Sequence, residues 1–196
     1  MARPKRKLNI KCTQTDCGSG LHCFLPTKKM REQKKQGVCI DCGVDLIDWH
    51  RLHRRAIEDI SYTEGALNRE WVRNFFWKIP LLQRVLNHAK RKGKVALRDS
   101  IYRNLEATIG SAQPFRDGSQ TEMPEPEDAA NIYAYARHAT ATCCRKCISQ
   151  WHGLPRGRVL TADELTYLSN LVCHYVDERI PDLPNQPQKI PAIRTQ

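Results

Sequence analysis

A run of fifteen residues from His138 to His152, HATATCCRKCISQWH, holds the densest set of metal-ligand side chains in the chain. Thiolates and imidazoles at short spacing are what a tetrahedral Zn²⁺ site needs. Cys144 and Cys147 form a C-x-x-C step, which lets two sulfurs reach one ion from a single tight turn. The two histidines flank this step closely enough to complete the tetrahedron. The predicted ligands of this Zn²⁺ site are therefore His138, Cys144, Cys147 and His152.

Cys143 directly precedes Cys144, and the side chains of neighbouring residues usually diverge. We expect one of the two to bind the ion and the other to pack or react, so Cys143 is a substitute ligand. The alternative is a set of buried free cysteines beside two core histidines. So many ligand-type side chains at ligand spacing favour the metal site.

A second set of ligand-type side chains lies near the N-terminus. Its last part, VCIDCG, has the form of a zinc knuckle, because the Gly after the second Cys permits a backbone turn that points amides at the sulfurs. A module this small buries little apolar surface, so a bound ion would supply much of its folding energy. We predict a zinc-ribbon-like module over residues 12–43. Its predicted ligands are Cys12, Cys17, Cys39 and Cys42, with Cys23 and His22 as substitutes.

Composition limits the class of protein. The chain has 196 residues, enough for one domain and a small module but not for two full domains. A formal net charge of +11 favours a polyanionic partner, nucleic acid before an acidic membrane surface. No apolar run approaches the roughly 20 residues that span a bilayer, and no secretory signal is visible, so we expect a cytoplasmic protein without a membrane partner. In a reducing cytosol, nine cysteines indicate metal binding rather than disulfides.

Basic residues gather in the first eleven residues, around Gly93 and in the turn after His152. Lysine and arginine in such clusters can neutralise phosphates and release counterions. The residues that we expect to contact nucleic acid are Arg3, Lys5, Arg6, Lys7, Lys90, Arg91, Lys92, Lys94, Arg156 and Arg158.

The elements that must position these side chains are helices. Apolar residues recur at helical spacing through most of the chain, and S/T-x-x-E capping boxes at Ser61 and Thr161 mark two helix starts. We predict a mainly α protein with a Cys/His metal knuckle. Its parts are a basic arm (1–11), the zinc-ribbon-like module (12–43), a mainly helical domain (44–180) containing the 138–152 cluster, and a Pro-rich tail (181–196). We expect the tail to be extended and disordered.

The C-terminal third contains a longer pattern. It consists of HATATCC-R-x-C, then W-H, a P-x-G-R step and an LT-x-x-E helix start, here within residues 138–147, 151–152, 154–158 and 160–164. In this pattern the chain, from about Arg116 to Leu183, resembles an uncharacterised bacterial family of unknown function. The resemblance implies one coherent domain in a bacterial or phage setting and implies no reaction. The N-terminal module is an addition to that domain.

The residues favour a zinc-stabilised nucleic-acid-binding protein of unknown specificity, with two Zn²⁺ sites. One alternative is a metal-dependent, nuclease-like enzyme in which His138 or His152 acts as a base beside an open metal position. A zinc deaminase is disfavoured, because no Glu completes an H-x-E step at His138. The other alternative is an iron–sulfur or redox centre made by Cys143, Cys144, Cys147 and Cys173.

Overall fold

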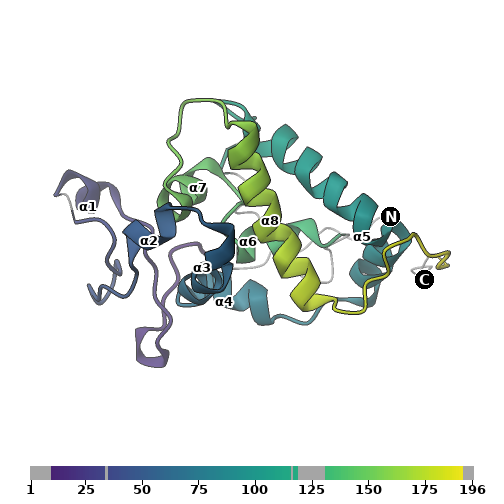
Figure 1. Ribbon diagram of the computed structural model, residues 1–196. Helices are drawn as coiled ribbons and strands as arrows, with labels where there is room; N and C mark the ends of the chain where they lie inside the picture. The colour runs from purple at the N-terminus through teal and green to yellow at the C-terminus, as the bar shows by residue number, and fades with distance from the viewer. Residues whose placement is uncertain (1–9, 34, 116, 119–130, 192–196) are drawn as a thin grey trace, which may run out of the picture.

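The computed structural model describes residues 10–33, 35–115, 117–118 and 131–191 (Figure 1). The elements in chain order are the 3₁₀ turn η1 (Cys17–Ser19), α1 (Lys28–Glu32), α2 (Trp49–His53), the 3₁₀ turn η2 (Ile57–Asp59), α3 (Ile60–Leu67), α4 (Trp71–Lys78), α5 (Gln83–Leu105), the π-helical turn η3 (Glu106–Gly110), α6 (Tyr133–Ala139), α7 (Arg145–His152) and α8 (Ala162–Arg179). The predicted mainly α fold is confirmed. None of the helices in the described residues combines the length and apolar character needed to cross a bilayer.

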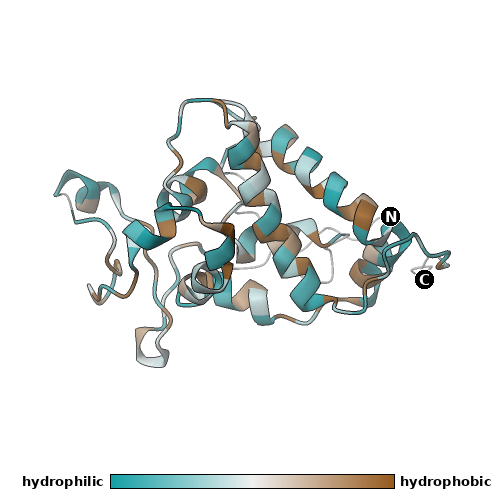
Figure 2. Cartoon of the chain, viewed as in Figure 1, coloured by the Kyte–Doolittle hydropathy of each residue, from teal (hydrophilic) through white to brown (hydrophobic). Residues whose placement is uncertain are grey.

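Four helices enclose the larger of two apolar cores. α4 packs against α6, α5 against α8, and α6 against α8. Leu97, Ile101 and Leu105 line the buried side of α5, and Leu168 and Val172 line that of α8. Figure 2 shows brown, hydrophobic segments interleaved with teal ones along both helices. The helical spacing of apolar residues in the sequence therefore corresponds to buried faces.

A smaller core joins the N-terminal module to α2 and α7. The ring of Phe24 lies 5.9 Å from that of Trp151 within it. The N–H of His22 donates to the carbonyl of Arg69 across 2.8 Å, and the N–H of Trp71 donates to the carbonyl of His22 across 2.9 Å. These contacts fasten the module to the start of α4.

The described part of the module contains no strand pair of the kind that a zinc ribbon has. It contains two isolated β-bridges, one between Asp16 and Leu21 and one between His22 and Glu70. Loops and short helical turns make up the rest of residues 10–48 apart from position 34. The knuckle is therefore set on loops rather than on a β-hairpin.

α5 bends at Gly93, whose φ of 73° lies in the left-handed region. The Pro-rich tail crosses this bend. The N–H of Lys94 donates to the carbonyl of Pro184 across 2.7 Å, and a Cβ at position 93 would lie 2.6 Å from the carbonyl carbon of Gln186. The expectation of a disordered tail is thus wrong for residues 184–188, which form hydrogen bonds with α5.

The capping box predicted at Thr161 and Glu164 is confirmed at the start of α8. The N–H of Glu164 donates to Thr161 Oγ1 across 3.2 Å, and the N–H of Thr161 donates to Glu164 Oε2 across 2.9 Å. The box predicted at Ser61 and Glu64 is wrong, because Ser61 already lies inside α3. Glu64 instead lies 2.9 Å from the ring of His174 on α8.

Candidate metal centres and basic cleft

The N-terminal module brings four ligand-type side chains into one group. The donor atoms of Cys17, His22, Cys39 and Cys42 all lie within 4.8 Å of one another. The Sγ atoms of Cys17 and Cys39 are 3.8 Å apart, and Cys42 Sγ lies 3.4 Å from His22 Nδ1. Three thiols and one imidazole form a ligand set that structural Zn²⁺ sites use. The group can therefore hold one metal ion.

The knuckle sequence positions two of these sulfurs. Gly43 has a φ of 75°, and its N–H donates to the carbonyl of Cys39 across 3.0 Å, which closes the turn. Burial raises the pKa of the Cys39 thiol, but backbone N–H groups, among them that of Cys42, and the ring of His22 together lower it to about 6. The turn thus favours the thiolate form, which is the form that binds metal.

Three of the four predicted ligands lie in this group. The fourth place is taken by His22, predicted as a substitute, while Cys12 lies outside the group. The other substitute, Cys23, is fully buried, and its Sγ donates to the carbonyl of Cys12 across 3.4 Å. The chain reverses between Asp16 and Leu21, which brings His22 back to the knuckle. That reversal is a tertiary feature that cysteine spacing does not reveal.

The segment that leads from α6 into the first turn of α7 brings three sulfurs together. The Sγ atoms of Cys143, Cys144 and Cys147 lie within 4.8 Å of one another, and all three residues are buried. Cys144 is the N-cap of α7, and its Sγ accepts the N–H of Cys147 across 3.4 Å. Hydrogen bonds from Cys143 and Cys147 hold the pKa of Cys144 far below its ordinary value. The positive end of α7 also faces these sulfurs, which favours negative charge there.

A buried ion pair lies beside the three sulfurs. Arg73, only 1 % exposed, donates from Nη2 to Cys147 Sγ across 3.2 Å and from Nη1 to the carbonyl of His138 across 2.8 Å. Its Nε donates to a carboxylate oxygen of Glu70 across 2.9 Å. The same oxygen accepts the indole N–H of Trp151 across 3.0 Å. The guanidinium therefore supplies positive charge where thiolates would need it.

The two predicted histidine ligands, His138 and His152, lie outside this group of three sulfurs. His138 Nδ1 lies 2.7 Å from the carbonyl of Ala134, and its ring stacks on Phe76 with centroids 4.9 Å apart. His152 Nε2 lies 3.0 Å from the carbonyl of Thr140. Burial lowers the pKa of both imidazoles to about 4, so both are neutral near pH 7. Each ring has one nitrogen against a backbone carbonyl, a contact that sequence spacing does not distinguish from a metal contact.

Cys173 also lies apart from the three sulfurs among the described residues. It lies on α8 in the larger core, where burial raises the pKa of its thiol. The four-cysteine set that includes Cys173 is therefore not assembled in this structure.

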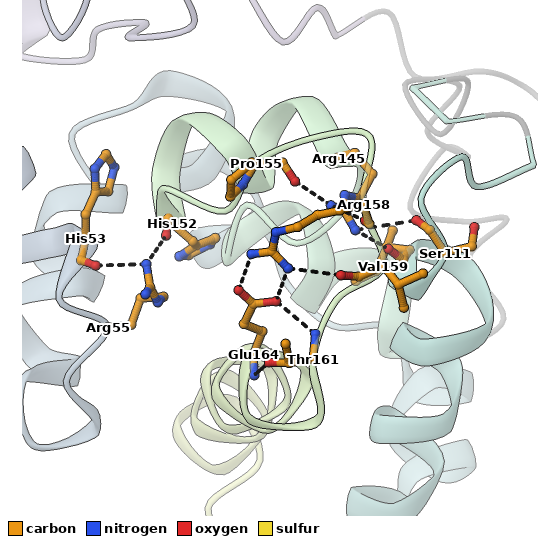
Figure 3. A network of polar contacts seen from close by, with 11 residues as sticks. His53, Arg55, Ser111, Arg145, His152, Pro155, Arg158, Val159, Thr161 and Glu164 are labelled. Carbon is orange, nitrogen blue, oxygen red and sulfur yellow. Dashed lines mark hydrogen bonds and ion pairs between the residues drawn. The ribbon is translucent and has the colours of Figure 1, made fainter.

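Arg145, which follows the three-residue TCC step of the pattern, fixes the turn after α7 (Figure 3). Its Nη2 donates to the carbonyls of Pro155, across 2.6 Å, and Arg158, across 3.0 Å, and its Nη1 donates to that of Ile109 across 3.0 Å. Arg158 in turn pairs with Glu164 in the first turn of α8. The hydrogen bonds of Arg145 on α7 and the pairing of Arg158 with Glu164 on α8 therefore both stabilise this turn.

The basic residues predicted to contact phosphates differ in their contacts and in their exposure to solvent. Arg3, Lys5, Arg6 and Lys7 lie outside the described residues. Lys94 lies 2.9 Å from the carboxylate of Asp177, Lys92 donates to Ser100, and Arg158 pairs with Glu164. The others are Lys90, which is half-buried, Arg91, which is exposed, and Arg156, which is exposed and lies 3.5 Å from the carboxylate of Asp117. Most of the α5 cluster is thus engaged within the protein or partly covered.

A cleft of about 520 Å³ opens between the N-terminal module and α7. Its lining includes Arg31, Lys146 and Arg156 together with Trp49 and His53, and no Asp or Glu is among the described residues that line it. Sequence analysis selects only Arg156 from this set. Arg31 and Lys146 come from separate segments, so their convergence with Arg156 appears only in the fold.

The fold and the two groups of ligands define a mainly helical protein with two candidate metal-binding sites. A family model described as domain of unknown function DUF4186 matches residues 63–177, more than half of the chain, and the chain belongs to this family. The matched range begins in α3, well before Arg116, where the resemblance seen in the sequence begins. It includes Arg73 and the three sulfurs but not the N-terminal module. No solved structure matches the chain.

Proposed function

We propose that this protein is a zinc-stabilised nucleic-acid-binding protein that holds its partner in the basic cleft between the N-terminal module and α7. Membership of the family supplies no activity, so the proposal rests on the residues of this chain. The observation that carries it is the cleft itself. Three cations and an aromatic ring converge there from segments that the two cysteine groups can hold in place.

Zn²⁺ is the proposed ion because thiolates and imidazole are its preferred structural ligands. The charge around the three sulfurs supports a thiolate site. Arg73 is paired with Glu70, but half-buried Arg137 also lies close and donates to the carbonyl of Cys143 across 3.1 Å. Buried charge is costly unless it is balanced. Thiolates bound to an ion would supply negative charge against these two arginines.

Two of the cleft cations neighbour the cysteine groups in the chain. Arg31 lies between His22 and Cys39 in the chain, so an ion in the first group would fix both ends of the segment that carries it. Lys146 directly precedes Cys147, within the three-sulfur group. Metal binding would therefore set the distance between cations that come from different parts of the chain.

Trp49 connects the two walls. Its indole N–H donates to the carbonyl of Gly37 across 2.9 Å, and its ring lies 5.3 Å from that of Trp151 on α7. A partly exposed tryptophan among cations offers a surface on which an unpaired base can stack. Arg31, Lys146 and Trp49 together would thus contact both phosphate and base.

The positions of the buried histidines favour binding over hydrolysis. His138 and His152 were the candidate bases of a nuclease-like enzyme, and both are buried, at most 4 % exposed, with one ring nitrogen against a backbone carbonyl. We therefore propose a binding function and assign no catalytic residue.

The test is charge reversal in the cleft. The triple variant Arg31→Glu, Lys146→Glu and Arg156→Glu is compared with wild type by fluorescence anisotropy on labelled single-stranded and duplex DNA and RNA over a range of salt. We expect wild-type affinity to fall steeply with salt and the triple variant to bind more weakly by about tenfold or more at low salt.

A matched control makes the same change in net charge away from the cleft. Lys78, Arg103 and Lys189 are exposed and lie outside the lining of the cleft, and their replacement by Glu should weaken binding much less. An equal loss in both variants, or no wild-type binding to any of the four probes at low salt, would contradict the proposal.

A further inference from the structure

We propose that Cys12 is the fourth ligand of a metal site whose other ligands are Cys143, Cys144 and Cys147. This inference rests on the metal binding proposed above and is independent of nucleic-acid binding. The spacing of the cysteines assigns Cys12 to the metal site of the N-terminal module. The inference assigns it instead to the site in the family domain.

Three sulfurs leave a structural zinc site incomplete. Closed sites are four-coordinate, whereas three protein ligands leave a position for water or substrate. Cys143, Cys144 and Cys147 are each at most 5 % exposed, and the adjoining Arg73 is 1 % exposed. A group so far from solvent favours a fourth ligand from the protein.

Other donors near the group make different contacts, such as Asp117 Oδ1, which accepts the N–H of Arg145 across 2.8 Å. His152 has Nε2 at 3.0 Å from the carbonyl of Thr140 and Nδ1 at 3.4 Å from the hydroxyl of Tyr167. Cys173 lies on α8 in the larger core. His138 directs Nδ1 at a backbone carbonyl and is kept as the competing candidate in the test below.

A series of contacts leads from Cys12 to the three-sulfur group. Burial raises the pKa of its thiol to about 11, and the charges of Arg73, Cys147 and Cys144 also act on this pKa, so the thiol is within electrostatic reach of all three residues. Its carbonyl accepts a hydrogen bond from Cys23 Sγ across 3.4 Å. Cys23 is fully buried and precedes Phe24, whose N–H donates to the carboxylate of Glu70, the partner of Arg73.

Cys12 lies outside the group whose donors are all within 4.8 Å, so binding would draw its thiol onto the other three. The adjoining chain is a turn in which the N–H of Gln14 donates to the carbonyl of Lys11 across 3.1 Å. Ile10 packs against the larger core and anchors the turn from the other side. The ion would then join the N-terminal arm directly to α7.

The inference also divides the nine cysteines of the chain into metal ligands and cysteines that bind no metal. Three belong to the first group and four to the second, so seven of the nine bind metal, and the two that remain are Cys23 and Cys173. X-ray absorption at the zinc edge of the full chain should then give a total of seven sulfur ligands for the two ions. A total of six sulfurs would overturn the inference.

The mutational test uses Cys12→Ser with Cys23→Ser as its matched control. Zinc affinity is measured by competition with a chromophoric chelator, and folding is followed by circular dichroism. We expect Cys12→Ser to weaken one of the two ions by more than about tenfold, since even changes around a ligand cost that much. Cys23→Ser should keep both ions at wild-type affinity. Cys12→His, which restores a donor atom, should recover most of the lost affinity.

Two results would overturn the inference while leaving the proposed function intact. One is Cys12→Ser retaining both ions at wild-type affinity. The other is the loss of one ion in His138→Gln but not in Cys12→Ser. A wild-type chain with fewer than two ions would instead contradict the proposed metal binding, and the inference with it.

Discussion

The guanidinium of Arg73 lies 3.2 Å from the Sγ of Cys147, a residue 74 positions further along the chain. Through Glu70, this contact reaches the N-terminal module, because a Glu70 carboxylate oxygen accepts the N–H of Phe24 across 3.1 Å. One buried ion pair therefore touches both the three-sulfur group and the segment next to His22. These contacts connect the segments that carry the two candidate metal sites.

Replacing Arg73 with Met should be among the most damaging single changes in the protein. It leaves the carboxylate of Glu70, which is fully buried, without its cationic partner. Breaking a buried pair in this way costs about 3–5 kcal/mol of unfolding free energy. Urea denaturation measures the loss, and Arg103→Met on the exposed side of α5 is the control. A loss no larger than that of the control would show that the pair is not needed.

Gly93 should not tolerate a side chain. An Ala there would occupy the left-handed region and place its Cβ 2.6 Å from backbone of the tail, so we expect a loss of about 1–3 kcal/mol. Gly65 gives the opposite case, because it lies within α3 with nothing within 4 Å of an added Cβ. Gly65→Ala should stabilise the protein by about 0.5–1 kcal/mol. Thermal unfolding of both variants should therefore shift in opposite directions, and equal shifts would contradict this account of the bend.

The pairing of Arg158 with Glu164 should make stability depend on pH. The hydrogen bond from Arg158 lowers the pKa of Glu164 from 4.5 to about 2. A carboxyl whose pKa is lower in the folded state stabilises the fold above the unfolded pKa, so this contribution is lost as pH falls from 4.5 towards 2. Glu164→Gln should be less stable than wild type near neutral pH, and the difference should shrink below pH 4.5.

Denaturation curves of both proteins at a series of pH values measure this effect. The difference between the two at each pH is the quantity of interest, since acid release of metal is common to both. A difference that stays constant through the acid range would count against the ion pair.

The sequence predicts the helices well because their apolar faces are local patterns. Leu97, Ile101 and Leu105 are spaced for one side of a helix and are buried on one side of α5. The T-x-x-E cap at Thr161 is equally local and is present. Ser61 has the same spacing to its Glu but lies inside a helix, because the chain before it already turns at η2. A local motif therefore identifies a cap only where the helix starts.

The sequence predicts that two cysteine-rich segments can bind metal, but it does not predict which residues form each group. The sequence identifies both cysteine-rich segments, and the structure gathers most of their sulfurs. It does not show that His22 returns to the knuckle or that His152 faces a backbone carbonyl, since both depend on contacts between distant segments. The same reason hides Arg73, which has no metal-ligand side chain and meets the sulfurs only through the packing of α4 on α6.

Metal content of the purified chain, measured with its melting temperature before and after exhaustive chelation, tests the central claim most directly. The account predicts two zinc ions per chain and a large fall in melting temperature once they are removed, because ions that bind only the folded chain stabilise it. A chain that contains neither zinc nor iron, and melts at the same temperature after chelation, would contradict it.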